Sequence, residues 1–261
     1  MVASILLGLS VWWNVRTSIT ALTLPGVPTA SSSSAGPALI RDASTGIGER
    51  SILVLADGSK VTLNTASAVR VDYRGHERRV TLVQGEAFFD VAKNRMRPFV
   101  VSAGSRDVIA VGTAFDVRLH DRQIKVTLVE GKVRIDRVVD RAEVGTPLAQ
   151  PVSAVVLEAG SALVAQEGGT DHVERLDAAR ATSWLTGKLV FDGERLIDVV
   201  AEMNRYSHER LEIADPALNA RKVSGVFDAT GGSTFAKALE AYGIARVTRQ
   251  TATTIVLNSP R

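Results

Sequence analysis

A short pattern that ends in glycine occurs twice in the chain, and it restricts the fold more than any other feature. Residues 80–85 read VTLVQG, residues 126–131 read VTLVEG, and residues 157–160 (LEAG) are a weaker third copy. Strand-forming residues followed by a polar residue and a glycine favour a strand, a corner and a second strand. Two strong copies are too few for a solenoid. The repeat therefore predicts a twisted β-sandwich or a barrel-like β domain with equivalent corners.

The sequence around the two strong copies is β-rich from about residue 50 to residue 165. Residues 51–64 (SILVLADGSKVTLN) read as two strands around Asp57-Gly58, a dipeptide that tolerates the positive φ angles of a tight hairpin. At least six more short strands follow up to about residue 165, and none has the apolar period of a helix. We therefore expect a mainly β domain over residues 46–170.

The pattern changes after residue 178. Leu196, Val199, Val200 and Met203 recur on one helical face, and a second helix around Phe235 precedes Gly243, a glycine placed to end it. Short strands surround both helices in the order β-α-β-β-α-β-β. Residues 184–258 are thus expected to form a small α+β domain.

The first 24 residues contain an apolar run that ends before Arg16, and three interpretations of this run are open. Residues 2–15 (VASILLGLSVWWNV) resemble the core of a signal peptide, the outer part of a transmembrane helix, or a buried helix of a soluble domain. Residues 25–45 are rich in Pro, Ser and Gly and read as a linker. An apolar segment followed by a tether favours a membrane-anchored or exported protein.

Composition excludes several classes of site. The chain has no cysteine, and its four histidines are far apart in sequence, so neither a metal site nor a cofactor is expected. The net charge is only +3, and arginines are spread along strands, so a nucleic-acid surface is not expected. No triad or carboxylate pair with interpretable spacing indicates an enzyme.

Five ordered motifs resemble one family. DGSKVTLN, GEAFFDV, RPFVV, VGTAFDV and VTLVEGKV resemble the ferric-citrate regulator (FecR) family of bacterial transmembrane anti-sigma regulators. Residues 184–218, with KVSGVF after them, resemble the C-terminal domain of that family, which is like the N-terminal domain of secretins and TonB-dependent receptors. The resemblance covers about residues 46–258.

The resemblance implies a periplasmic regulator that relays a signal from a TonB-dependent outer-membrane receptor, in iron or siderophore uptake, towards an extracytoplasmic-function sigma factor. It places the protein in the inner membrane, single-pass, with most of the chain in the periplasm, and residues 184–258 against the receptor's signalling domain. The chain begins at the apolar segment, so a sigma-factor partner is expected only if a further N-terminal domain exists. An exported envelope scaffold without a sigma partner is the alternative.

Two sites are predicted. In some relatives a Gly-Thr bond of the β domain cleaves itself, and Gly112-Thr113 occupies the matching place, with Thr113 as nucleophile; the alternative is an ordinary strand entered through a glycine. The second site is the strand formed by Val223, Ser224, Gly225, Val226 and Phe227, which either adds to a partner's strand at a sheet edge or is a core strand.

Overall fold

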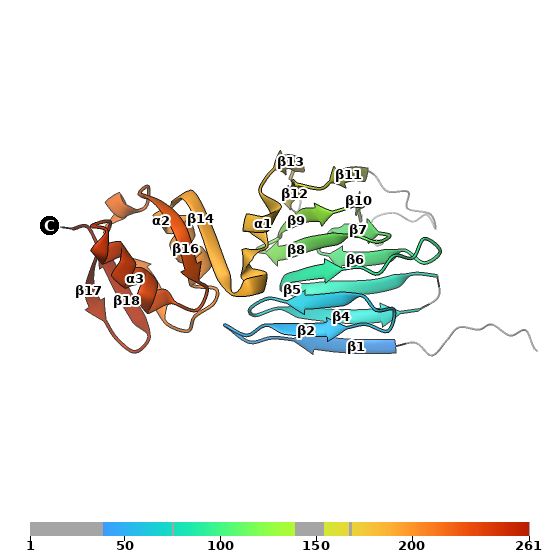
Figure 1. Cartoon of the computed structure of the whole chain (residues 1–261), viewed down its shortest axis with the longest axis horizontal. Helices are drawn as coiled ribbons and strands as arrows, with labels where there is room; N and C mark the ends of the chain where they lie inside the picture. Colours follow the sequence, from blue (N-terminus) through green and yellow to red (C-terminus); the bar gives the residue numbers. More distant parts are fainter. Residues whose placement is uncertain (1–38, 75, 139–153, 167–168, 261) are drawn as a thin grey trace, which may run out of the picture. The chain divides into compact units, whose positions relative to one another are not determined.

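The computed structural model describes residues 39–74, 76–138, 154–166 and 169–260, and these residues belong to one compact unit. Thirteen strands, β1 to β13, form one sheet (Figure 1). The first seven are β1 (Leu39–Ser44), β2 (Ser51–Val54), β3 (Lys60–Leu63), β4 (Ala68–Tyr73), β5 (Arg78–Asp90), β6 (Phe99–Ala103) and β7 (Arg106–Ala110). The other six are β8 (Ala114–His120), β9 (Gln123–Glu130), β10 (Lys132–Arg137), β11 (Ala154–Glu158), β12 (Ser161–Gln166) and β13 (His172–Arg175). We call β1–β13 the β half, and the mainly β class is confirmed.

Strand β5 folds this sheet over at Gly85. Its first part pairs with β4 and β6, and its second part pairs with β3 and β8. Gly85 has φ +83°, and a Cβ there would overlap Ser67 Oγ, so only glycine fits the fold-over. The two ends of β5 come together, because Arg78 Nη1 donates to the Ala92 carbonyl at 3.0 Å. The rings of Phe89 and Phe99, from the two branches, meet inside with centroids 6.1 Å apart.

The other two copies of the glycine pattern lie at further crossings between the branches. Gly131 (φ +88°) connects β9, which belongs to the branch of β8, to β10, which belongs to the branch of β7. Gly160 (φ +79°) joins β11 to β12 and returns the chain to the first of these branches. The prediction of equivalent glycine corners is therefore confirmed.

The Asp57-Gly58 turn holds the folded sheet closed as well as joining β2 to β3. Arg78 is almost fully buried and pairs with the Asp57 carboxylate, which also accepts a hydrogen bond from Tyr73 Oη at 3.1 Å. Burial opposes ionisation of Asp57, but hydrogen bonds from Ser59 and Arg78 outweigh it and lower the pKa of Asp57. The turn thus supplies the counter-charge for a buried guanidinium.

The end of the predicted linker is corrected by the structure. Residues 39–44, placed in the linker 25–45, form β1, which pairs antiparallel with β4. Asp42 pairs with Arg70 across the two strands at 2.9 Å, and Ala43 packs against the core. The Pro- and Ser-rich composition before residue 38 masked a strand that begins where the composition changes.

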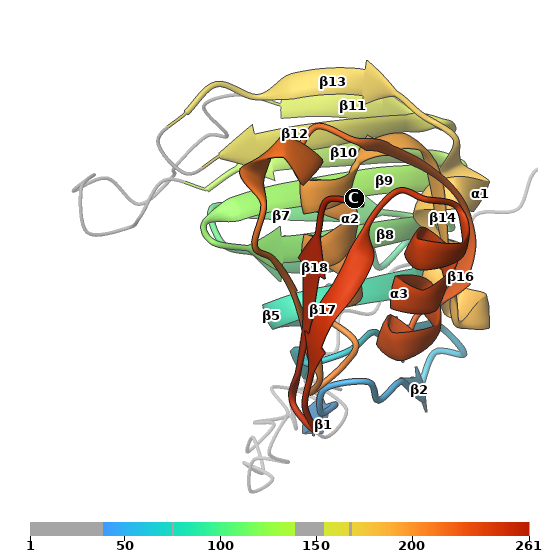
Figure 2. The ribbon, with the colours of Figure 1, turned by 90° about the vertical axis from the view of Figure 1, so that its left-hand side faces the viewer.

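The C-terminal half, α1 to β18, follows the predicted element order after two short turns of helix. It comprises α1 (Ala178–Ala181), η1 (Ser183–Thr186), β14 (Lys188–Arg195), α2 (Leu196–Met203), β15 (Arg210–Ile213), η2 (Pro216–Leu218), β16 (Lys222–Asp228), α3 (Gly232–Ala241), β17 (Arg246–Gln250) and β18 (Thr254–Asn258). Strands β14 and β16 form one sheet, and β15, β18 and β17 form another. Helix α3 lies beside the β17–β18 hairpin (Figure 2), and Phe235 of α3 meets Phe227 of β16 edge to face.

Within the ranges given above, no helix is long and apolar enough to cross a membrane. The predicted membrane segment, residues 1–24, lies outside the described residues.

Candidate functional site

The Gly112-Thr113 bond lies in the connection between β7 and β8, just before the latter begins. Gly112 has φ +154°, and a Cβ there would lie 2.9 Å from Lys93 Cβ, so the position excludes larger residues. Thr113 is 7% exposed, its carbonyl accepts from Val91 N–H, and its Oγ1 has no hydrogen-bond partner. A hollow of about 490 Å³ beside the bond is lined by Lys93, Arg95, Val111, Gly112, Thr113 and Lys132. The bond therefore has a buried hydroxyl next to it and cations around it.

The predicted partner strand is the body of β16, and among the described strands it pairs only with β14. Val223 is buried, Ser224 is exposed, Gly225 is half-buried, Val226 is 63% exposed and Phe227 is half-buried. One face of this strand packs inward while its other face and one edge stay open. The strand is therefore packed on one face, and its addition to a partner's strand stays a prediction.

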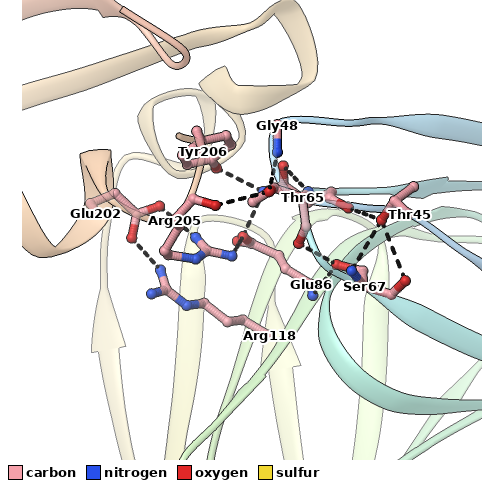
Figure 3. Close-up of polar contacts among 10 residues, drawn as sticks. Thr45, Gly48, Thr65, Ser67, Glu86, Arg118, Glu202, Arg205 and Tyr206 are labelled. Carbon is pink, nitrogen blue, oxygen red and sulfur yellow. Dashed lines mark hydrogen bonds and ion pairs between the residues drawn. The ribbon is translucent and has the colours of Figure 1, made fainter. Parts of the chain in front are cut away.

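A third site, which the sequence patterns did not indicate, is the contact between the two halves. Glu86 of β5 pairs with Arg205, which follows α2, at 2.7 Å, and both side chains are largely buried. Arg205 also bonds to Glu202 of α2, and Glu202 accepts from Arg118 of β8 at 2.9 Å. Figure 3 shows this chain of alternating charges, running from the sheet to the helix and back.

Hydrogen bonds from a loop of the β half extend the contact. Asn64 donates both to Glu86 Oε2 at 2.7 Å and to Tyr206 Oη at 2.8 Å. Thr65 Oγ1 donates to the Arg205 carbonyl at 2.9 Å (Figure 3). Asn64 is fully buried, so its amide has no water to replace these partners. We call the contact of Asn64, Thr65, Glu86, Phe88 and Arg118 with Glu202, Arg205 and Tyr206 the joint.

Two adjacent phenylalanines in β5 explain why apolar packing reaches the joint. Phe89 points into the core of the β half, whereas Phe88 packs against the apolar cluster of the C-terminal half. Successive side chains of a strand point to opposite faces. A strand with a phenylalanine on each face therefore has apolar surface to cover on each face. The outer face of β5 around Glu86 and Phe88 is therefore an internal surface of the molecule.

The joint also holds a carboxyl group without an opposite charge of its own. Asp116 of β8 is 4% exposed, and its Oδ1 has no hydrogen-bond partner. Burial raises the pKa of Asp116 well above its ordinary value, and the negative charge of nearby Glu86 raises it further. Burial would also raise the pKa of Glu202, but Arg205 and Arg118 outweigh it and hold that pKa below its ordinary value.

A cavity of about 420 Å³ lies next to these carboxyl groups. Its polar wall includes Glu86, Asp116 and Glu202, and its apolar wall includes Trp184 and Phe191. The Trp184 Nε1 atom is buried and has no partner among the described residues. No group of three metal-ligating side chains occurs in the part of the chain that the structure describes.

The sequence patterns did not indicate the joint, because Glu86, Arg118 and Glu202 look like ordinary exposed charges on amphipathic elements. The available signal was the Phe88-Phe89 pair, which indicates a strand covered on both faces.

Comparison with known proteins finds a family model that matches part of the chain and solved structures that share the fold. Residues 41–134 match the sequence model of the FecR protein family. A crystal structure at 2.50 Å of a candidate anti-sigma factor from Parabacteroides distasonis ATCC 8503 is 25% identical, with a TM-score of 0.68, covering 85% of this chain and 100% of that one. A second structure, at 1.65 Å and described in the same words, is 24% identical with a TM-score of 0.69 and the same coverage, and it supports the fold alone. No curated protein matches the chain.

Proposed function

We propose that this chain is a regulator of the anti-sigma type that acts in the bacterial envelope, because residues 41–134 match the sequence model of the FecR protein family. In this proposal a single-pass protein of the inner membrane exposes both halves to the periplasm. The C-terminal half binds the signalling domain of a TonB-dependent outer-membrane receptor, and the joint passes that event to the β half. The relay ends at an extracytoplasmic-function sigma factor, and iron or siderophore uptake is the process it controls.

The observation that carries the proposal is the likeness to the 25%-identical candidate anti-sigma factor. That likeness covers 100% of the relative and 85% of this chain, which is more than either half alone. A relay needs both halves and a defined contact between them. The joint supplies such a contact, because its ion pairs and hydrogen bonds connect β5, β8 and the loop after β3 to α2 and the residues that follow it.

Receptor binding tests the proposal directly. The chain would be mixed with the purified N-terminal signalling domains of the TonB-dependent receptors of its own organism, and binding measured by isothermal titration calorimetry. We expect one of these domains to bind and deletion of the chain to change transcription from a sigma-dependent promoter. Binding by none of them, with transcription unchanged, would favour the exported scaffold.

We further propose that Gly112-Thr113 is cleaved by attack of the Thr113 hydroxyl on the Gly112 carbonyl. The hydroxyl would add to the carbonyl carbon, the peptide nitrogen would leave as an amine, and water would then hydrolyse the resulting ester. The buried Thr113 Oγ1 without a partner supports this proposal, since no hydrogen bond holds the nucleophile elsewhere.

Purified protein on a denaturing gel tests the cleavage. We expect a pair of fragments that meet at Gly112-Thr113, and we expect Thr113→Ala to abolish them. Thr127→Ala, at another buried threonine on the neighbouring strand β9, is the matched control and should leave the fragments in place. Full-length chain of 27.8 kDa alone would show that the connection is a plain entry into a strand.

A further inference from the structure

The charges at the joint balance only when one carboxyl group carries a proton. Glu86 and Glu202 face two guanidinium groups, those of Arg118 and Arg205, in alternating ion pairs. Asp116 is the third carboxyl group and has no cation to itself. Two guanidinium groups therefore meet three carboxyl groups in a largely buried cluster, and an unpaired buried charge is costly.

The sheet register brings the extra carboxyl group close to Glu86. Asp116 is opposite Phe88 and Arg118 is opposite Glu86 in the β5–β8 pair, so Asp116 is a diagonal neighbour of Glu86 on the outer face. Side chains in that relation lie within reach of one another. The negative charge of Glu86 therefore opposes ionisation of Asp116 and adds to the effect of burial.

The charged groups on the other elements around Asp116 are occupied elsewhere. On β9, Lys125 pairs with Glu174 of β13 at 3.0 Å. At the far wall of the cavity Arg180 pairs with Glu194 at 3.6 Å, and Asp198 pairs with Arg195 at 2.7 Å. Asp177 accepts from backbone N–H groups at the start of α1.

Two further groups complete the surroundings. Arg175, at the end of β13, is exposed at the cavity mouth and has no ion pair among the described residues. The Tyr206 hydroxyl is held by Asn64. None of these neighbours supplies a buried cation for Asp116.

We propose that docking of the C-terminal half onto the β half takes up one proton at the Asp116–Glu86 carboxyl pair, so that the joint loosens as the pH rises. This inference deepens the proposed relay by naming what regulates its joint. The pH dependence of docking can be measured without a receptor. Failure of receptor binding and failure of the pH dependence are therefore separate outcomes.

The direction and size of the effect follow from proton linkage. Undocking returns Asp116 to water, where a carboxyl group has a pKa of about 3.9. Between that value and the raised pKa of the docked state, docked protein binds more protons than undocked protein, so rising pH favours undocking. The docking constant should fall about tenfold per pH unit across that window.

Distance measurements between two spin labels can follow docking, because the chain contains no cysteine of its own. Labels at Val83→Cys on β5 and Tyr242→Cys at the end of α3 replace two exposed side chains, one in each half. The Gly48→Ala background would bring the undocked population into the measurable range. A Cβ added at Gly48, in the loop after β1, would lie 2.8 Å from the Tyr206 carbonyl oxygen and within 4 Å of none of the carboxyl groups.

We expect the docked fraction in this background to fall as the pH rises, and Asp116→Asn to remove the slope while keeping a donor for Glu86. Glu158→Gln, which removes an exposed carboxyl group that pairs with Lys132 and does not line the cavity, should keep the slope. A slope that persists in Asp116→Asn would overturn the proposal. Should that variant not fold, a ¹³C carboxyl titration of Asp116 in the unsubstituted chain decides, and a midpoint near 3.9 would equally overturn it.

Discussion

At the scale of single residues, Gly48 shows how little space separates the two halves. It has φ +75°, its N–H donates to Thr65 Oγ1 at 2.8 Å, and a Cβ there would lie 2.8 Å from the Tyr206 carbonyl oxygen. A backbone atom cannot swing aside as a long side chain can. Glycine is therefore required at this position both by the backbone angle and by the docked partner.

We expect Gly48→Ala to destabilise the protein through both effects. Placing a Cβ at positive φ costs roughly 1–2 kcal/mol, and overpacking adds typically about 1–3 kcal/mol. Gly58→Ala is the matched control, because Gly58 has φ +84° and a Cβ added there would have nothing within 4 Å. Denaturant unfolding measures the loss in the free energy of unfolding for both variants. The difference between the two losses is the cost of the contact with Tyr206. Equal losses would mean that Tyr206 does not press on Gly48.

At the scale of elements, β16 presents an open edge next to exposed apolar surface. Val226 and Val190 are paired across β16 and β14, and Val226 is 63% exposed. An extended segment of a partner could pair with the free edge of β16 and cover Val226, whereas Phe227 is held inward by Phe235. The strand can thus gain a neighbour without losing its own packing.

We expect Val226→Glu to weaken binding of the receptor's signalling domain by about tenfold or more, because a buried carboxylate is costly in an apolar contact. The fold should be unchanged, since the side chain is exposed in the free protein. Val173→Glu replaces a valine that is 53% exposed on β13 of the β half and is the matched control. Titration calorimetry measures the affinity of each variant for the signalling domain. Equal affinities for the two variants would show that β16 is not part of the interface.

The elements also show which parts of the fold the sequence could predict. The hairpin around Asp57-Gly58, the glycine corners and the order of the C-terminal elements depend on local chemistry, and each was found. Strand β1 was missed because its register depends on pairing with β4, a partner about thirty residues away in sequence. Helix α2 follows β14 directly, because β14 continues through an irregularity to Arg195.

The joint could not be predicted because its residues come together only after both halves fold. Glu86 and Arg205 are 119 residues apart, and Asn64 and Tyr206 are 142 apart. Each is a reasonable surface residue in its own segment. Only the Phe88-Phe89 pair indicated locally that the outer face of β5 would be covered.

At the scale of the whole molecule, the joint decides whether the two apolar clusters unfold together. One cluster lies in the β half and the other in the C-terminal half, and either could form a core alone. The Glu86–Arg205 pair connects them at 2.7 Å with side chains 6% and 17% exposed. Removing one member of such a pair leaves the other buried without its counter-charge.

We expect Glu86→Gln and Arg205→Met to lower the free energy of unfolding by about 3 kcal/mol each, and the double variant to lose less than their sum. Segment-resolved hydrogen exchange measures this: residues 78–90 and 196–203 should open together in the unsubstituted chain and separately in either single variant. Lys132→Met breaks an ion pair whose side chains are 69% and 66% exposed, and it should change little. Two outcomes would contradict this prediction: the single variants lose no more free energy of unfolding than this control, or both segments still open together. Either would mean that the apolar contact of Phe88 couples the halves and that the ion pair only fixes their register.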